Sequence, residues 1–70
     1  MKVRIKEFED MAKEFGLDED GNIDCYCSFA KDMREHCGEI IEVYQLFPIR
    51  GLFVYNGWVF SDDMYEVIEE

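Results

Sequence analysis

Hydrophobic and polar positions follow two different periods in the first part of the chain. Val3 and Ile5 alternate with basic residues, and this period of two predicts a short strand over residues 2–6. Apolar residues then recur at the i, i+3, i+4, i+7 spacing of one helix face over residues 8–15, which predicts a short amphipathic helix. Gly16 follows directly and is expected to end this helix in a left-handed conformation.

A second strand and a second helix are predicted in the middle of the chain. Apolar and polar residues alternate over residues 23–27, which is typical of a brief strand. Ser28 is then expected to cap a helix over residues 29–37, because its hydroxyl can accept a hydrogen bond from a free amide of the first turn. Gly38 is expected to end this helix as Gly16 ends the first.

The second half of the chain has the pattern of β structure, with β-branched and aromatic residues in short runs. Asn56-Gly57 predicts a tight hairpin, because a type I′ turn needs a positive φ at both central residues. The runs predict strands over residues 40–47, 52–55, 58–60 and 65–68, with a single helical turn at 61–64.

This order of elements predicts one α+β domain over residues 1–70. Its expected architecture is a small bent antiparallel sheet or an SH3-like barrel, with two short helices packed on it. A chain of 70 residues buries only about 60% of its unfolded surface. Hydrophobic residues make up 49% of this chain and aromatic residues 16%, so it can still form a dense core.

Two segments carry a resemblance to a known group of proteins. The positions that match are Phe29, Met33, Cys37 and Gly38, followed after the β run by Trp58, Phe60, Ser61, Asp62 and Met64. This pattern resembles short uncharacterised proteins of phages, prophages and Gram-positive bacteria. The resemblance implies an SH3-like barrel and an origin in a phage or mobile element. That group has no agreed function, so the resemblance implies no site residues.

Charge excludes several classes of partner. The chain has 17 acidic and 7 basic residues, for a formal net charge of -10, which repels nucleic acids and anionic lipids. The imbalance is greater over residues 38–70, where Arg50 is the only basic residue. The acidic bias either serves solubility or forms a face for a basic partner. No apolar run approaches the ~18 residues of a membrane span, and no signal-peptide core is present. The three cysteines are an odd number, which suits a reducing compartment, so we expect a cytoplasmic protein that does not contact membranes.

The candidate metal sites are incomplete. Asp18, Asp20 and Gly21 match the third, fifth and sixth positions of a calcium loop, but Gly16 and Cys27 occupy the first and twelfth, where carboxylates are needed. This pattern predicts a solvated turn. A zinc site would draw on Cys25, Cys27, His36 and Cys37, whose spacing does not suit tetrahedral coordination, so we expect buried structural cysteines.

No catalytic residue is predicted. His36 is the only histidine and adjoins Cys37, so the two side chains should point apart around a helix rather than form a nucleophile and its base. The neighbours Asp62 and Asp63 are expected to cap a turn. The chain also has no phosphate-binding loop, nucleophile elbow or dinucleotide fingerprint. We therefore expect a protein that is not an enzyme and has no cofactor.

The aromatic residues of the β region are the remaining candidates. Aromatics near a hairpin either pack across strands or form a docking patch. On the second interpretation, Tyr44, Tyr55 and Trp58 are the anchors and Asp62, Asp63 and Glu66 form an acidic rim.

These residues predict a small acidic accessory protein that binds another macromolecule, namely a protein with a basic surface, and does not bind nucleic acid directly. The alternative is an acidic mimic of nucleic acid that inhibits a DNA-binding or host-defence protein. A weak metal-binding module is the third hypothesis.

Overall fold

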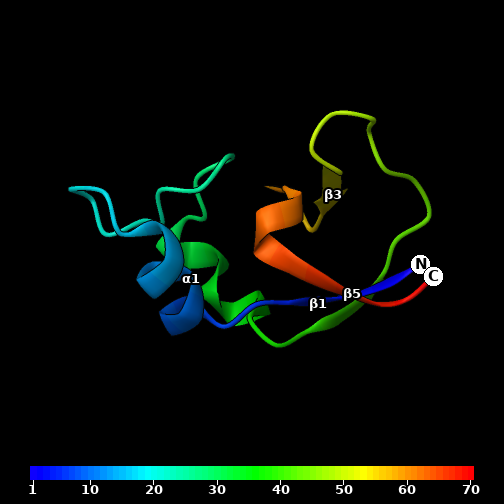
Figure 1. Ribbon diagram of the computed structural model, residues 1–70, viewed down its shortest axis with the longest axis horizontal. Helices are drawn as coiled ribbons and strands as arrows, with labels where there is room; N and C mark the ends of the chain where they lie inside the picture. The colour runs from blue at the N-terminus through cyan, green and yellow to red at the C-terminus, as the bar shows by residue number, and fades with distance from the viewer.

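The computed structural model describes residues 1–70 and shows an α+β protein, as predicted (Figure 1). Its elements follow in the order β1 (Lys2–Ile5), α1 (Phe8–Phe15), η1 (Lys31–His36), β2 (Ile40–Glu42), β3 (Phe53–Tyr55), β4 (Trp58–Phe60), η2 (Asp62–Met64) and β5 (Tyr65–Glu69). α1 and η1 lie at one end of the molecule and both termini lie at the other, while η2 lies between them and leads into β5 (Figure 1).

The strands form two small antiparallel sheets. β1 lies in the centre of a three-stranded sheet, between β2 and β5. Val3 pairs with Ile41 on one side and with Val67 on the other. β3 and β4 form a separate hairpin, in which Tyr55 pairs with Trp58. The bent-sheet expectation is therefore confirmed, whereas no barrel is closed.

The hairpin turn has the backbone that its sequence predicts. Asn56 has a φ of 53° and Gly57 a φ of 81°, and the two residues connect β3 directly to β4. Positive φ at both central residues is the requirement of a type I′ turn, which matches the twist of the flanking strands.

The predicted strand over residues 40–47 is too long, and this is why no barrel closes. β2 ends at Glu42, and Val43 is the last residue to bond with the first strand, through its amide to the Met1 carbonyl at 2.7 Å. Beyond it the chain arches over the end of the sheet (Figure 1). The Phe47 amide then bonds to the Leu52 carbonyl at 2.9 Å, within the arch itself.

The helical end differs from its prediction in three places. α1 is as predicted and ends at Gly16, whose φ of 83° favours glycine but whose ψ of 170° lies outside the left-handed helical region that was predicted. The prediction of a strand over residues 23–27 is wrong, because Ile23 makes only isolated bridges to Leu17 and Phe29. The Ser28 cap is also wrong: Ser28 has a φ of 59° and lies in a turn, and the second helix is a 3-10 helix that begins at Lys31.

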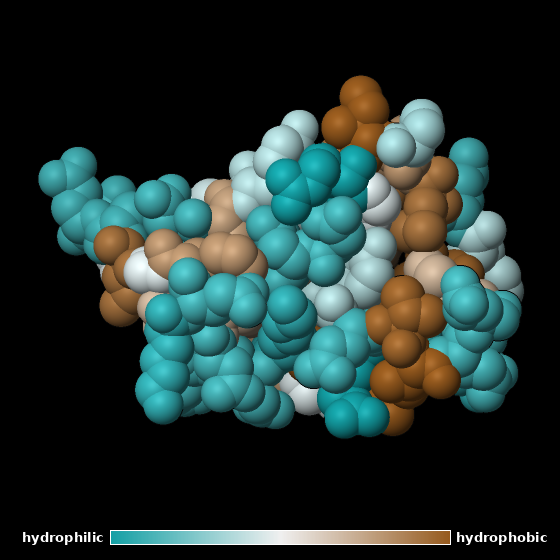
Figure 2. All heavy atoms as spheres, viewed as in Figure 1, coloured by the Kyte–Doolittle hydropathy of each residue, from teal (hydrophilic) through white to brown (hydrophobic).

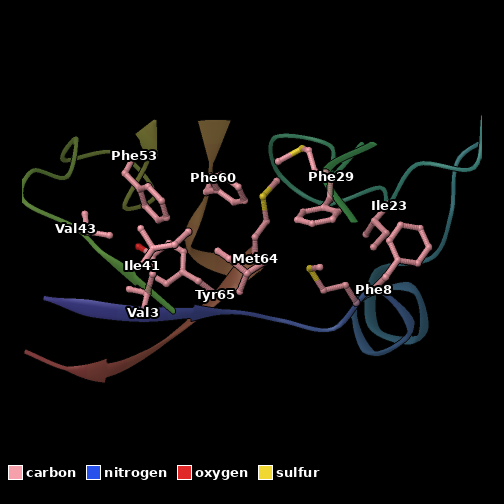
Figure 3. Close-up of a cluster of buried hydrophobic side chains, with 13 residues drawn as sticks. Val3, Phe8, Ile23, Phe29, Ile41, Val43, Phe53, Phe60, Met64 and Tyr65 are labelled. Atoms are coloured by element: carbon pink, nitrogen blue, oxygen red, sulfur yellow. The ribbon is translucent and has the colours of Figure 1, made fainter. Parts of the chain in front are cut away.

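One hydrophobic core connects the two ends. Thirteen buried residues form it, in a row that follows β1 (Figure 3). Phe29 contacts both Phe8 and Phe60, with ring centroids 6.3 Å apart in each pair. Phe53 stacks on Phe60 at 5.1 Å, and it lies with Ile41 and Val43 at the β end of the row (Figure 3).

None of the helices has the length and apolar character needed to cross a membrane.

Candidate functional site

The candidate site is a groove of about 550 Å³ between the two sheets. One side is formed by residues 41–45 with Phe47, and the other by the strand Phe53–Tyr55. Seven of the nine lining residues are hydrophobic. The groove exists because β2 ends early: the chain that leaves it never pairs with β3, so the two backbones line an open space.

Apolar side chains around this groove are unusually accessible. Tyr44 is 92% exposed, and Phe47 and Val54 are also exposed, while Phe53 is buried among the lining residues. Apolar residues gather at the strand end of the surface, whereas the helical end is mainly hydrophilic (Figure 2). Contiguous exposed apolar surface of this kind is typical of an interaction site.

Tyr55 is the one aromatic residue of the groove that is held by hydrogen bonding. Its hydroxyl donates to Glu39 Oε1 at 2.7 Å, and its ring meets the ring of His36 edge-on, with centroids 5.6 Å apart. The bond to Glu39 raises the pKa of the Tyr55 hydroxyl. Tyr55 therefore lines the groove in one fixed orientation, whereas Tyr44 has no comparable partner.

A buried histidine completes this network. His36 Nδ1 lies 2.7 Å from Glu39 Oε2, and His36 Nε2 lies 3.3 Å from Asn56 Nδ2. Because the Glu39 carboxylate only accepts, Nδ1 donates to it, while Nε2 also lies 3.6 Å from Glu35 Oε1. The bonds from His36 and Tyr55 lower the pKa of Glu39. The network joins η1 to the tip of the hairpin and fixes one side of the groove.

Sequence reasoning missed this role of His36. His36 and Glu39 are the ends of a four-residue turn, which the Glu39 amide closes by donating to the His36 carbonyl at 3.0 Å. The available signal was Gly38 at the third position of that turn, where a type II turn needs a positive φ. The contacts of His36 with Tyr55 and Asn56 span 19 and 20 residues respectively and leave no local pattern.

Only two of the three predicted aromatic anchors line the groove. Tyr44 and Tyr55 both line the groove. Trp58 pairs with Tyr55 across the hairpin, but it is half-buried against the core and does not line the groove.

The predicted acidic rim is dispersed, and part of it is occupied within the molecule. Arg50 donates to Asp62 Oδ1 from Nε at 3.1 Å and from Nη2 at 3.0 Å, and it also reaches Asp63. Asp63 accepts a further bond from the Tyr26 amide at 2.9 Å. Glu66 lies on β5, opposite Arg4 of β1.

The metal and thiol candidates remain separate features of the chain. Asp18 Oδ1 accepts from the amides of Asp20 and Asn22 at 2.9 and 3.0 Å, which closes the acidic loop as a turn. No group of three or more His, Cys, Asp or Glu residues is placed to hold a metal ion. All three cysteines are free and half-buried.

The thiols of Cys25 and Cys37 are not activated as nucleophiles. Burial, and next the charge of Asp63, raise the pKa of Cys25. Burial, and next the charge of Glu7, raise the pKa of Cys37. A raised pKa lowers the fraction of thiolate, which is the reactive form.

No family model, curated protein sequence or solved structure matches this chain. The resemblance to short phage and Gram-positive proteins therefore stays an expectation from sequence.

Proposed function

We propose that this chain is a small acidic accessory protein, not an enzyme, that binds another protein through the groove between its two sheets. The observation that carries the proposal is Tyr44: a large aromatic side chain, 92% exposed, at the mouth of a groove with a mainly hydrophobic lining. Tyrosine and tryptophan that become desolvated at the centre of an interface supply much of its binding energy.

The two tyrosines are suited to different parts of this task. Tyr55 is already held by Glu39 at 2.7 Å, so a partner that contacts it loses little conformational entropy in doing so. Tyr44 is free, so it can adjust to the partner and bury most of its surface. Replacing such an anchor with alanine costs about 2 kcal/mol or more, which is about a thirtyfold loss of affinity.

Charge supports a basic partner. The net charge of -10 attracts a basic protein from a distance and raises its association rate. Within residues 38–70, Arg50 is the one Lys or Arg, and Asp62 already binds its guanidinium.

The alternative, an acidic mimic of nucleic acid, requires carboxylates aligned on one face without interruption. β1 lies between the acidic strands β2 and β5 and places basic residues among them. Lys2 pairs with Glu42 on one side and Glu69 on the other, and Arg4 pairs with Glu66. This alternation of charge favours the docking proposal.

Affinity capture with matched baits tests the proposal. Immobilised wild-type protein is compared with Tyr44→Ala and with Tyr26→Ala, each incubated with a Gram-positive bacterial lysate and analysed by quantitative mass spectrometry. Tyr26 is 53% exposed and lies outside the groove, so it is the matched control. We expect proteins that wild type and Tyr26→Ala retain and Tyr44→Ala loses. Equal retention by all three baits would refute the groove as the docking surface.

A further inference from the structure

We propose that the groove accepts an extended basic segment of the partner, which adds as a β-strand between the free edges of β2 and β3. This inference rests on the proposed function and specifies its ligand. It follows from the backbone groups that face the groove, in addition to the side chains that line it.

The edge of β3 carries free hydrogen-bonding groups. In a hairpin with a two-residue turn, the residues that flank the turn form a hydrogen-bonded pair, and such pairs alternate with non-hydrogen-bonded pairs along the ladder. Tyr55 and Trp58 flank the turn, so Val54 and Val59 form the non-hydrogen-bonded pair. The amide and carbonyl of Val54 therefore point away from β4, on the edge where Val54 lines the groove. No turn or loop hydrogen bond uses them.

The edge of β2 is free by the same argument. Val43 exchanges two hydrogen bonds with Met1, at 2.7 Å through its amide and at 3.3 Å through its carbonyl. Alternation makes the neighbouring pair, Glu42 with Lys2, a non-hydrogen-bonded one. The amide and carbonyl of Glu42 therefore point away from β1, and Glu42 also lines the groove. Two unpaired strand edges thus line one apolar space, and such edges are templates for another strand.

The dimensions suit a short extended segment. A strand residue occupies about 160 Å³, from a rise of about 3.3 Å, a strand spacing of about 4.8 Å and a sheet spacing of about 10 Å. A groove of about 550 Å³ therefore holds about three residues of such a strand. Alternate side chains of the segment would face the buried Phe53 and Val43, and these should be apolar.

Charge decides between possible occupants. No Lys or Arg lines the groove, and its one carboxylate, Glu42, lies 3.1 Å from the Met1 ammonium, so the charge that acts on an occupant is the net -10 of the molecule. A second copy of this chain brings another ten negative charges, so repulsion opposes self-association. Lysine or arginine at the outward positions of the segment would be attracted by this net negative charge. The expected ligand is therefore an extended sequence in which apolar and basic residues alternate.

The probe is a set of end-blocked hexapeptides that alternate lysine with valine, isoleucine, leucine or phenylalanine. Binding to the full chain is followed by NMR, together with hydrogen exchange of the Val54 and Glu42 amides. We expect exchange at both amides to slow by about tenfold or more when the peptide is saturating, because both become ladder donors. The matched glutamate peptides should not bind.

Two further arms separate strand addition from side-chain docking. Peptides N-methylated at alternate amides keep their side chains but lose the ladder donors, and they should bind at least about tenfold more weakly. Val54→Pro removes the free edge amide of β3 and should abolish binding. Val59→Pro makes the same change on the opposite edge of the same hairpin, so it should bind as wild type does.

The outcomes distinguish this inference from the function on which it rests. If no lysine peptide binds at about 1 mM, a concentration that detects even the weakest specific affinities, the inference is overturned. It is also overturned if N-methylated and parent peptides bind equally. In either case a partner that Tyr44→Ala fails to capture would still support docking through side chains. Should Val54→Pro fail to fold, the N-methylated peptides decide the question on wild-type protein.

Discussion

At the scale of single residues, His36 and Glu39 link the helical end of the molecule to the groove. His36 is 7% exposed, and its ring contacts Tyr55 at 5.6 Å and Phe60 at 6.3 Å between centroids. Both of its nitrogens have partners, and Glu39 accepts from His36 and Tyr55 with separate oxygens. The orientation of Tyr55 in the groove therefore depends on residues that a partner need not touch.

Glu39 should make stability depend on pH in the acid range. Its folded pKa lies below the ordinary value of 4.5, so it stabilises the folded state fully above about pH 4.5. That contribution is lost as the pH falls through the lower folded pKa. Urea midpoints measured from pH 7 to pH 3 should therefore fall less steeply for Glu39→Gln than for wild type. Glu19→Gln removes the same charge far from the network and should retain the wild-type slope; identical slopes in all three proteins would contradict the role of Glu39.

Gly38 should tolerate no β-branched residue without a cost. It has a φ of +80°, and an added Cβ would lie 2.9 Å from Glu7 Oε1, the end of a flexible exposed side chain that can move away. The left-handed backbone then sets the cost of Gly38→Val at about 1 kcal/mol or more. Gly21→Val, at a φ of +85° in open space, should cost a similar amount. Denaturant unfolding measures both, and unchanged stability of Gly38→Val would refute the left-handed assignment.

Single-residue predictions succeeded where the backbone alone decides the outcome. Gly38 and Asn56-Gly57 were predicted because positive φ is a local requirement that few residues satisfy. The Ser28 cap failed because the Ile23 and Phe29 bridge places Ser28 in a turn. Of the three aromatic anchors predicted from sequence, Tyr44 and Tyr55 line the groove, but sequence could not show that Trp58 is half-buried outside it.

At the scale of elements, the early end of β2 creates the groove. β-branched and aromatic residues continue to Phe47, so intrinsic propensity predicts a strand up to that residue. The strand nevertheless ends at Glu42, because hydrogen bonding to β1 stops at the Val43 and Met1 pair. Strand propensity takes effect only where a partner edge is present, and this could not be inferred from one segment alone.

Proline substitution tests this end of β2. Gln45 is exposed and its amide forms no backbone hydrogen bond, so Gln45→Pro should cost less than about 1 kcal/mol in the free energy of unfolding. Val43→Pro removes the 2.7 Å bond to Met1 and disturbs a buried side chain, and it should cost about 3 kcal/mol. Chemical denaturation compares the two. Equal and large losses would mean that residues 43–47 belong to a closed sheet.

At the scale of the whole molecule, one core and one charge imbalance define the protein. The 13 core residues come from both ends of the molecule, so the sheets and helices should unfold together. Composition predicted a folded acidic domain, and the order of predicted elements gave its α+β class. Neither could predict the division into two sheets, which depends on long-range pairing of β5 with β1.

The core should need no metal. All 13 of its residues are hydrophobic, and no cluster of ligands is placed to hold an ion. Dialysis against a strong chelator should leave the thermal midpoint unchanged in a calorimetric scan. A fall of more than about 10 °C would exceed the ~4–8 °C that 1 kcal/mol produces in a domain of this size and would support a metal-binding role.

The most direct test of docking through the groove is a titration of a captured partner at about 50 mM and about 500 mM salt, since screening shortens severalfold over that range. The groove predicts that Tyr44→Ala weakens binding about thirtyfold at both salt concentrations, because the lost energy is desolvation of an anchor. It also predicts that Tyr26→Ala binds as wild type does, and that the wild type loses less than about tenfold at high salt, because rim charges act mainly on the association rate. The opposite result would be a wild-type affinity that falls about a hundredfold or more at high salt and is nearly unchanged by Tyr44→Ala. That result would contradict docking through the groove and favour an acidic mimic of nucleic acid.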